Sequence, residues 1–306
     1  MRRMLVLVFS TVSTLLIALT ISFALTRASG NPVFQILGEN ATDDQVRALE
    51  ASLGLDQPLL IQYFEYLVRI AVFDLGDSVR YGTGNWELIS GRLGATVQLA
   101  LTALALGVVI GVGLGVLAAV REGTWVDRAA SALALVGQSM PAFWVGIMLI
   151  SVFAVRLDLL PAGQTGTWRH LILPAVTLSL LPMARVARLT RAAVAEAIRE
   201  PYVTSARSRG YTERRVLVRH VAKNASVPVL TITGLQVGAL LSGTVTVELV
   251  FAWPGLGSLA VQAVQFRDFP MVQAIVIFGA VTFVAINLMV DVAAAAIDPR
   301  IRTRSS

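Results

Sequence analysis

The sequence contains no cysteine, and charged residues make up only 14% of its 306 positions. Without cysteine the chain can form neither a disulfide framework nor a thiolate metal site. Soluble domains carry about a quarter charged residues, so the composition argues against a soluble globular fold. Lysine is almost absent too, because Lys223 is the one lysine and it follows Ala222. A Walker A loop requires Gly-Lys-Ser/Thr, so the chain cannot hydrolyse ATP by itself.

Histidine is equally scarce. His170 and His220 are the two histidines, and neither lies in a His/Glu cluster with the spacing of metal ligands. No combination of residues resembles a nucleophile triad or an intramembrane protease. We therefore expect no catalytic residue, no metal site and no cofactor in this chain.

Apolar residues, by contrast, reach 56% of the chain and gather in long runs. A helix that crosses a bilayer needs about 20 such residues at ~1.5 Å rise per residue. Runs of this length cover residues 4–26, 95–120, 129–155, 227–250 and 271–297, and a shorter run, 171–187, is interrupted by Pro174 and Pro182. None alternates with the period of two that a barrel strand requires. The pattern predicts an all-α integral membrane protein with six transmembrane helices, the fourth of them broken.

The charges predict the topology of these helices. The stretch 185–223 holds ten basic residues against three glutamates, whereas 27–94 holds nine acidic residues against five arginines. Basic segments stay in the cytoplasm, so we expect both termini inside, the tail 298–306 included, and 27–94 outside. The net charge of +6 follows from this arrangement and does not indicate nucleic-acid binding. Residues 1–26 also resemble a signal peptide, but their apolar core is long, which favours a retained helix.

The outer segment 27–94 reads as an ordered layer rather than a linker. Residues 42–52 have the pattern of a capped amphipathic helix that ends at Gly54. A second helix is predicted over 58–72, with a proline at its beginning.

Three glycines, Gly107, Gly111 and Gly115, repeat at steps of four in the second apolar run. Small residues at this spacing let two helix backbones approach closely in a membrane. We interpret them as a packing seam toward another helix or subunit, and ordinary membrane glycine is the alternative.

Polar residues inside the spans are costly and usually face a cavity or each other. They are Gln138, Ser139, Gln236, Asn287 and Asp291. Pro141 is expected to kink the third helix and to free a carbonyl near Gln138. We predict a translocation pathway lined by Gln138, Ser139, Pro141 and Gln236, with interhelical hydrogen bonding as the alternative. Few fixed charges line this path, and Asp291 is expected to pair with an arginine of the inner loop.

The inner loop 190–226 carries the most specific pattern. Pro201 breaks the preceding helix, and a short helix then ends at Gly210, which adopts a left-handed cap without steric cost. Thr212 can cap the following helix. The sequence therefore predicts a helix–Gly–helix element that exposes small residues among arginines. Nearby Arg185, Arg188 and Arg191 are assigned to the positive-inside distribution.

The loop continues with a second recognisable pattern. Tyr-Val-x-x-Ala-Arg-x-x-Gly at 202–210 precedes Arg-His-x-x-x-Asn-x-x-x-Pro at 219–228. Together they resemble the cytoplasmic coupling loop of ABC importer permeases, in the dipeptide/oligopeptide/nickel branch. The general family pattern is Glu-Ala-Ala-x-x-x-Gly, of which this chain keeps Ala206 and Gly210 but not the Glu or the first Ala. The resemblance extends over about residues 1 to 302, through these segments: Phe73-Asp74-Leu75-Gly76, Ser139-Met140-Pro141-Ala142-Phe143-Trp144, Leu159-Leu160-Pro161-Ala162-Gly163, Phe251-Ala252-Trp253-Pro254-Gly255-Leu256-Gly257 and Asp298-Pro299-Arg300-Ile301-Arg302.

This resemblance implies a type I ABC importer permease in the plasma (inner) membrane of a bacterium, with a core domain over 95–297. The chain would form half of a pore for dipeptides or oligopeptides. Its implied partners are a second homologous permease, an extracytoplasmic binding protein and two ATPase subunits that bind ATP and Mg²⁺. Coupling to the ATPase subunits would use the 202–226 loop, through Tyr202, Ala206, Arg207, Ser208, Arg209, Gly210, Arg214, His220 and Asn224.

Other functions stay open at this point. The same machinery could import nickel or another small solute. A secondary transporter or channel would need coupling charges deep in the spans and often internal repeats, which the sequence does not show. A membrane-anchored assembly or sensor protein would not require the helix–Gly–helix element.

Overall fold

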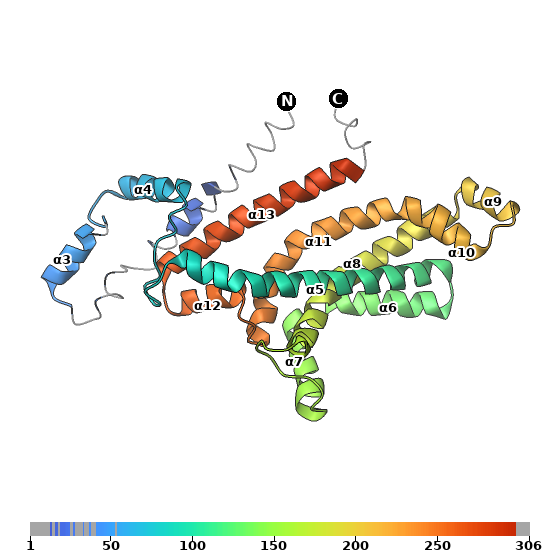
Figure 1. Ribbon diagram of the computed structural model, residues 1–306, viewed down its shortest axis with the longest axis horizontal. Coiled ribbons are helices and arrows are strands. Elements are labelled where there is room, and N and C mark those ends of the chain that lie inside the picture. The colour runs from blue at the N-terminus through green and yellow to red at the C-terminus, as the bar shows by residue number, and fades with distance from the viewer. Residues whose placement is uncertain are drawn as a thin grey trace, which may run out of the picture. The chain divides into compact units, whose positions relative to one another are not determined.

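The computed structural model describes residues 41–52 and 54–297 and, between residues 13 and 37, a number of separate positions (Figure 1). Every regular element in that part of the chain is a helix, and its β-type pairing is limited to an isolated bridge between Asp77 and Gly84. The predicted all-α class is confirmed. The chain divides into a first unit (1–93 and 258–285) and a second unit (94–257 and 286–306).

The helices follow one another without intervening strands. In chain order they are α3 (Asp43–Ser52), α4 (Leu59–Ala71), α5 (Asn85–Val120), α6 (Trp125–Ser139), α7 (Ala142–Leu149), the π-helical η1 (Ile150–Arg156), α8 (Trp168–Ile198), α9 (Pro201–Ser208), α10 (Glu213–Val216), the π-helical η2 (Leu217–Val221), α11 (Ala222–Val250), α12 (Leu256–Gln265) and α13 (Phe269–Ile297).

Three of these helices are long and apolar enough to cross a membrane: α5, α8 and the stretch Phe269–Ile286 of α13. Two bent pairs, α6 with α7–η1 and the two parts of Glu213–Val250, raise the number to five if each pair is one span. Of the first predicted span, 4–26, the structure describes separate positions between 13 and 24, and these are helical. A multi-pass protein follows from these helices, and the number six stays a prediction.

The third apolar run is broken far more sharply than a kink. α6 and the α7–η1 segment differ in direction by 105°, and Figure 1 shows α7 turned away from α6. The cause is local, because a residue that precedes proline avoids the helical region. Met140 accordingly has φ −84° and ψ 131°, and Pro141 becomes the residue that caps α7. The predicted kink at Pro141 is thus a bend of 105°, and a single span over 129–155 stays a prediction.

The fourth run shows the opposite outcome. α8 continues through both Pro174 and Pro182 as one helix, so the predicted break is wrong. Much of α8 is buried inside the second unit, and neighbouring helices can support a helix that loses individual N–H groups. The hydroxyl of Thr177 also donates to the Leu173 carbonyl at 2.8 Å.

The predicted packing seam of Gly107, Gly111 and Gly115 is confirmed, and these glycines pack against α8. A Cβ on Gly111 would lie 2.7 Å from the Met183 carbonyl oxygen, and one on Gly115 would lie 2.6 Å from that of Ala187. Helix backbones meet here without side chains between them, as the predicted small-residue packing requires.

The first unit contains the two helices predicted in the outer layer. Thr42 precedes α3, and its N–H donates to the Gln45 side chain at 3.0 Å, which is the reciprocal half of a capping box. Gly54 follows α3 with φ +65°, and Pro58 precedes α4. Both predicted helices are confirmed within a residue of their ends.

Asp268 fixes the turn that leads into α5, within the same unit. Its buried carboxylate accepts the Ser78 hydroxyl and the backbone N–H groups of Val79 and Arg80 at 3.3 Å. It also accepts the N–H of Met271 at 3.3 Å, in the first turn of α13. One side chain therefore caps a helix and orders a loop.

Candidate functional site

The predicted helix–Gly–helix element is present in the second unit. α9 begins at Pro201 and ends at Ser208, and Gly210 follows with φ +75°. Thr212 precedes α10 with an extended backbone, although its side chain makes no capping hydrogen bond. A Cβ on Gly210 would meet no atom within 4 Å, so the glycine is required by its backbone conformation and not by crowding.

The element has a core of its own, made of small and β-branched side chains. Its buried members come from the ends of α5 and α8, from α9 to η2 and from the start of α11: Ala119, Val194, Ala197, Val203, Ala206, Val216, Val221 and Ala225. This core joins the element firmly to α8 and α11. It also corrects the predicted knuckle, because Ala206 is only 4% exposed and packs inward.

Arg207 differs from its predicted role as well. Its guanidinium forms two hydrogen bonds with the Glu213 carboxylate, at 2.9 and 3.2 Å, so it closes the element internally. The side chains of Ser208, Arg209, Arg214 and Asn224 are exposed, as is Gly210, and Arg207 is also exposed despite its ion pair. These six predicted coupling residues are part of the accessible surface of the element.

Aromatic stacking orders the second half of the element. The rings of Tyr211 and His220 stack with centroids 5.9 Å apart, and the Arg215 guanidinium lies 4.5 Å from the Tyr211 ring centroid. His220 therefore supports the turn that contains Gly210. Tyr202 is partly buried and packs against the small core.

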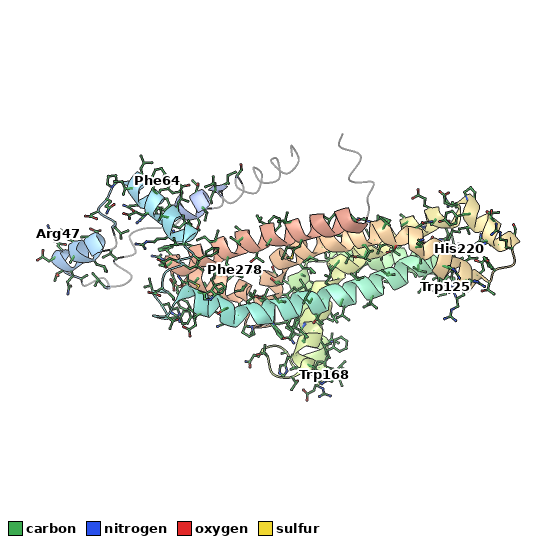
Figure 2. All side chains as sticks on the ribbon, turned by 45° about the horizontal axis from the view of Figure 1, so that its top comes forward. Arg47, Phe64, Trp125, Trp168, His220 and Phe278 are labelled. Carbon is green, nitrogen blue, oxygen red and sulfur yellow. The ribbon has the colours of Figure 1, made fainter. Side chains whose placement is uncertain are left out.

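The element lies at the same end of the second unit as the turn between α5 and α6. Arg199, just after α8, donates two hydrogen bonds to Glu122 of that turn, at 2.8 and 2.9 Å. Figure 2 shows His220 and Trp125 together at this end, away from Trp168. The exposed Trp125 and Trp168 rings begin α6 and α8, in positions suited to the two membrane interfaces.

A second ion pair lies beside this turn. Arg191 of α8 donates to both carboxylate oxygens of Asp127 in α6, at 2.6 and 2.8 Å. The Gly123 N–H donates to the same carboxylate at 3.1 Å. The assignment of Arg191 to the charge distribution alone is therefore incomplete, because it fixes α6 to α8.

The two glutamines of the predicted pathway are brought together. Gln138 and Gln236 line one cavity of about 170 Å³ between α6, α8 and α11. Arg185 donates to the Gln236 side-chain oxygen at 3.0 Å. The other two predicted residues behave differently: Ser139 bonds back to the Leu135 carbonyl, and Pro141 marks the break before α7. The side chains of Asn287 and Asp291, and thus the predicted pairing of Asp291, lie outside the described part of the structure.

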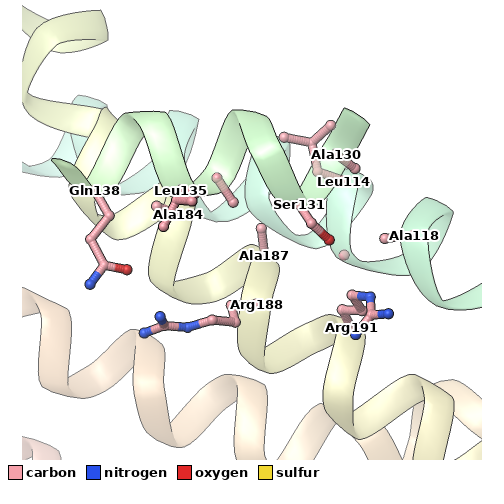
Figure 3. A pocket seen from close by; sticks show the side chains of 12 residues that line it. Leu114, Ala118, Ala130, Ser131, Leu135, Gln138, Ala184, Ala187, Arg188 and Arg191 are labelled. Carbon is pink, nitrogen blue, oxygen red and sulfur yellow. The ribbon is translucent and has the colours of Figure 1, made fainter. Parts of the chain in front are cut away.

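A larger cavity of about 280 Å³ shares Gln138 with the smaller one and extends along α8 to Arg191 (Figure 3). Its walls are mostly alanine and leucine from α5, α6 and α8, and its polar lining comes from Ser131, Gln138, Arg188 and Arg191. Figure 3 shows Arg188 and Gln138 at one end and Arg191 at the other. The prediction that few fixed charges line the path overlooked Arg188.

Sequence reasoning also missed Glu248. This glutamate is fully buried near the end of α11 and accepts the Thr96 hydroxyl of α5 at 2.8 Å. Thr96 in turn accepts the N–H of Leu256 at 2.8 Å. A Cβ on Gly255 would collide with the Glu248 carboxylate. The sequence feature that could have pointed to Glu248 is that it is a lone acidic residue in the apolar run 227–250.

The same corner joins two of the quoted sequence motifs. The Gln164 N–H donates to the Phe251 carbonyl at 2.8 Å, and Gly163 packs so closely on Phe251 that a Cβ would overlap it. The Trp253 indole N–H donates to the Ala95 carbonyl at 2.9 Å. The 159–163 and 251–257 motifs thus form one packed junction with the start of the second apolar run.

Comparison with known families shows the class of protein to which the chain belongs. Residues 1–100 match the N-terminal model, and residues 111–303 the main model, of the binding-protein-dependent transport system inner membrane components. The chain belongs to this family. It is therefore a multi-pass inner-membrane protein, a permease component of an ABC importer. Both matched ranges include segments on which the resemblance was based.

Several relatives match this permease over nearly its whole length. The dipeptide transport system permease protein DppB of Alkalihalophilus pseudofirmus is 36% identical over 99% of this chain and 98% of its own. The glutathione transport system permease protein GsiC of Escherichia coli is 40% identical over 89% of each chain.

Solved structures share the fold. An amino acid ABC transporter covers 69% of this permease and 94% of its own chain, with a TM-score of 0.55 and 18% identity. The MetNI methionine ABC transporter, in an inward facing conformation, covers 69% and 96%, with a TM-score of 0.58 and 19% identity.

Proposed function

We propose that this permease forms half of the translocation pathway of an ATP-driven importer of peptides. Its relatives are named for the transport of dipeptides and of glutathione, which are both peptides. The proposed assembly adds a second homologous permease, an extracytoplasmic binding protein and two ATPase subunits that hold ATP and Mg²⁺. Both termini of the chain would lie in the cytoplasm. Nickel and other small solutes are the alternative cargo.

One observation supports coupling through the 202–226 loop above others. The element presents Ser208, Arg209 and Gly210 outward, while its own core ties it to α8 and α11. Both of those helices line the cavity that contains Gln138 and Gln236. A push on the exposed turn would therefore reach the pathway through packed side chains rather than through a flexible loop.

Replacing Gly210 by tryptophan is expected to abolish binding of the ATPase subunits while the permease stays folded. The bulky ring would project from the proposed docking turn. The new Cβ would have no atom of this chain within 4 Å, so the side chain can be added without a clash at that atom. We expect at least a tenfold loss of co-purified ATPase subunit, the effect of about 1.4 kcal/mol or more. Co-purification and peptide-stimulated ATP hydrolysis in lipid measure it.

Gly123 provides the matched control. It is exposed at the same end of the unit, has φ +79°, and a Cβ there also meets nothing within 4 Å. Tryptophan at Gly123 adds the same ring and the same backbone strain outside the proposed docking turn. Equal association in wild type and in the Gly210→Trp variant contradicts the proposed coupling role. Stimulation of the wild-type assembly by a nickel-loaded binding protein alone would replace the cargo.

A further inference from the structure

The cavities beside Gln138 contain a buried donor without an acceptor. Gln236 is 3% exposed, and its side-chain oxygen is occupied by the Arg185 guanidinium at 3.0 Å. That bond fixes the orientation of the amide, so the NH₂ group is the end left over. Among the described residues this nitrogen has no hydrogen-bond partner. Since buried N–H groups are rarely left unpaired, this nitrogen is free to donate to an acceptor that a ligand or a water brings.

Arg188 adds a charge to the same region. It is exposed toward the larger cavity and, within the described ranges, forms no ion pair, unlike its neighbour Arg191. Arg188 lies three positions before Arg191, which places it about 4.5 Å nearer the start of α8, at ~1.5 Å per residue. An arginine that lines a cavity of a membrane protein without a carboxylate partner is a candidate for a functional role.

The hydrogen-bond donors and acceptors that line the two cavities indicate which kind of ligand fits them. Arg188 and the Gln236 NH₂ group can only donate, and Gln138, which lines both cavities, can donate to one group and accept from another. Such a set fits a carboxylate at the arginine, followed by a peptide carbonyl at the glutamines. The apolar alanine and leucine walls leave room for small side chains.

We propose that Arg188, Gln138 and Gln236 bind the carboxylate end of the peptide during its passage, with Arg188 as the specificity-determining contact. This inference rests on the proposed function and extends it to cargo with a free C-terminal carboxylate. The two cavities, about 280 and 170 Å³, would form half of a binding site that the second permease completes.

The test uses the complete importer in proteoliposomes and compares wild type with Arg188→Gln and Arg188→Lys. Uptake of radiolabelled alanyl-alanine and of its C-terminal amide is measured, each at binding-protein loading that gives full stimulation of ATP hydrolysis. Arg188→Gln is expected to lower uptake of the acid more than about tenfold and that of the amide less than about twofold. Arg188→Lys should retain most of the uptake, and stimulated ATP hydrolysis should persist in both variants.

Arg128→Gln is the matched control, because Arg128 is an exposed arginine of α6 that lines neither cavity. If Arg188→Gln imports the acid as well as Arg128→Gln does, the inference is wrong while the importer function stands. An equal loss for acid and amide also overturns it. A loss seen only in vesicles that contain phosphatidylglycerol, and not in pure phosphatidylcholine, would overturn the inference and assign Arg188 to an anionic lipid headgroup instead. A wild-type assembly that imports neither peptide refutes the proposed function, and this inference with it.

Discussion

Replacing Gly115 by leucine is expected to prevent correct packing of the second unit. A Cβ there would lie 2.6 Å from both the Ala187 carbonyl oxygen and the Thr190 Cβ, and 3.0 Å from the Arg191 backbone nitrogen. Backbone atoms cannot move aside as a flexible side chain can, so α5 and α8 must separate along the seam. We expect a loss of more than about 3 kcal/mol in unfolding free energy, at the upper end of overpacking effects. The yield of monodisperse purified protein and its thermal midpoint measure this.

Gly113 offers a control two residues away on the same helix. It is exposed, and a Cβ there would meet nothing within 4 Å. Gly113→Leu adds the same side chain and the same helix propensity without touching α8. Equal stability of the two variants would show that the α5–α8 contact is looser than the structure has it.

The second large effect is expected at Glu248. Substitution by alanine leaves a cavity at a fully buried position and takes away the acceptor of the Thr96 hydroxyl. Together these losses should cost about 2–5 kcal/mol. Because Thr96 also accepts the Leu256 N–H, we expect the 251–257 segment to become sensitive to protease. Thermal unfolding and limited proteolysis of the purified permease check both effects.

Glu248→Gln separates shape from charge. The amide keeps the volume of the side chain and an oxygen that can accept from Thr96, so its cost should stay below about 2 kcal/mol. An alanine variant as stable as wild type would mean that the carboxylate does not hold this junction together. A glutamine variant as damaged as alanine would instead show that the negative charge is required.

Local signals in the sequence predicted the elements whose causes are local. Thr42, Pro58 and Gly210 each act through their own backbone or that of a near neighbour, and all three lie where the pattern placed them. Proline at 174 and 182 misled the prediction of α8, since its consequence depends on the helices packed around it. Pro141 had the larger effect, because Met140 leaves the helical region and α7 turns away.

The candidate site could be predicted by position but not by orientation. The loop pattern predicted the helix–Gly–helix element, yet it could not show that Ala206 faces inward or that Arg207 is held by Glu213. Those facts depend on how α9 folds back onto α8. Gln138 and Gln236 are about a hundred residues apart in the chain, and only the packing of α6 and α11 against α8 brings them to one cavity.

The length of α8 has a mechanical consequence. This helix continues through both prolines for 31 residues. It runs from the exposed Trp168 to the core of the helix–Gly–helix element. At ~1.5 Å per residue this is about 46 Å, so a tilt of about 5° around one end displaces the other by about 4 Å. A broken helix would absorb such a tilt at its hinge. An unbroken α8 would act as a lever arm instead: if ATPase subunits bind the helix–Gly–helix element as proposed, a small angular change there would be magnified at the far end of α8.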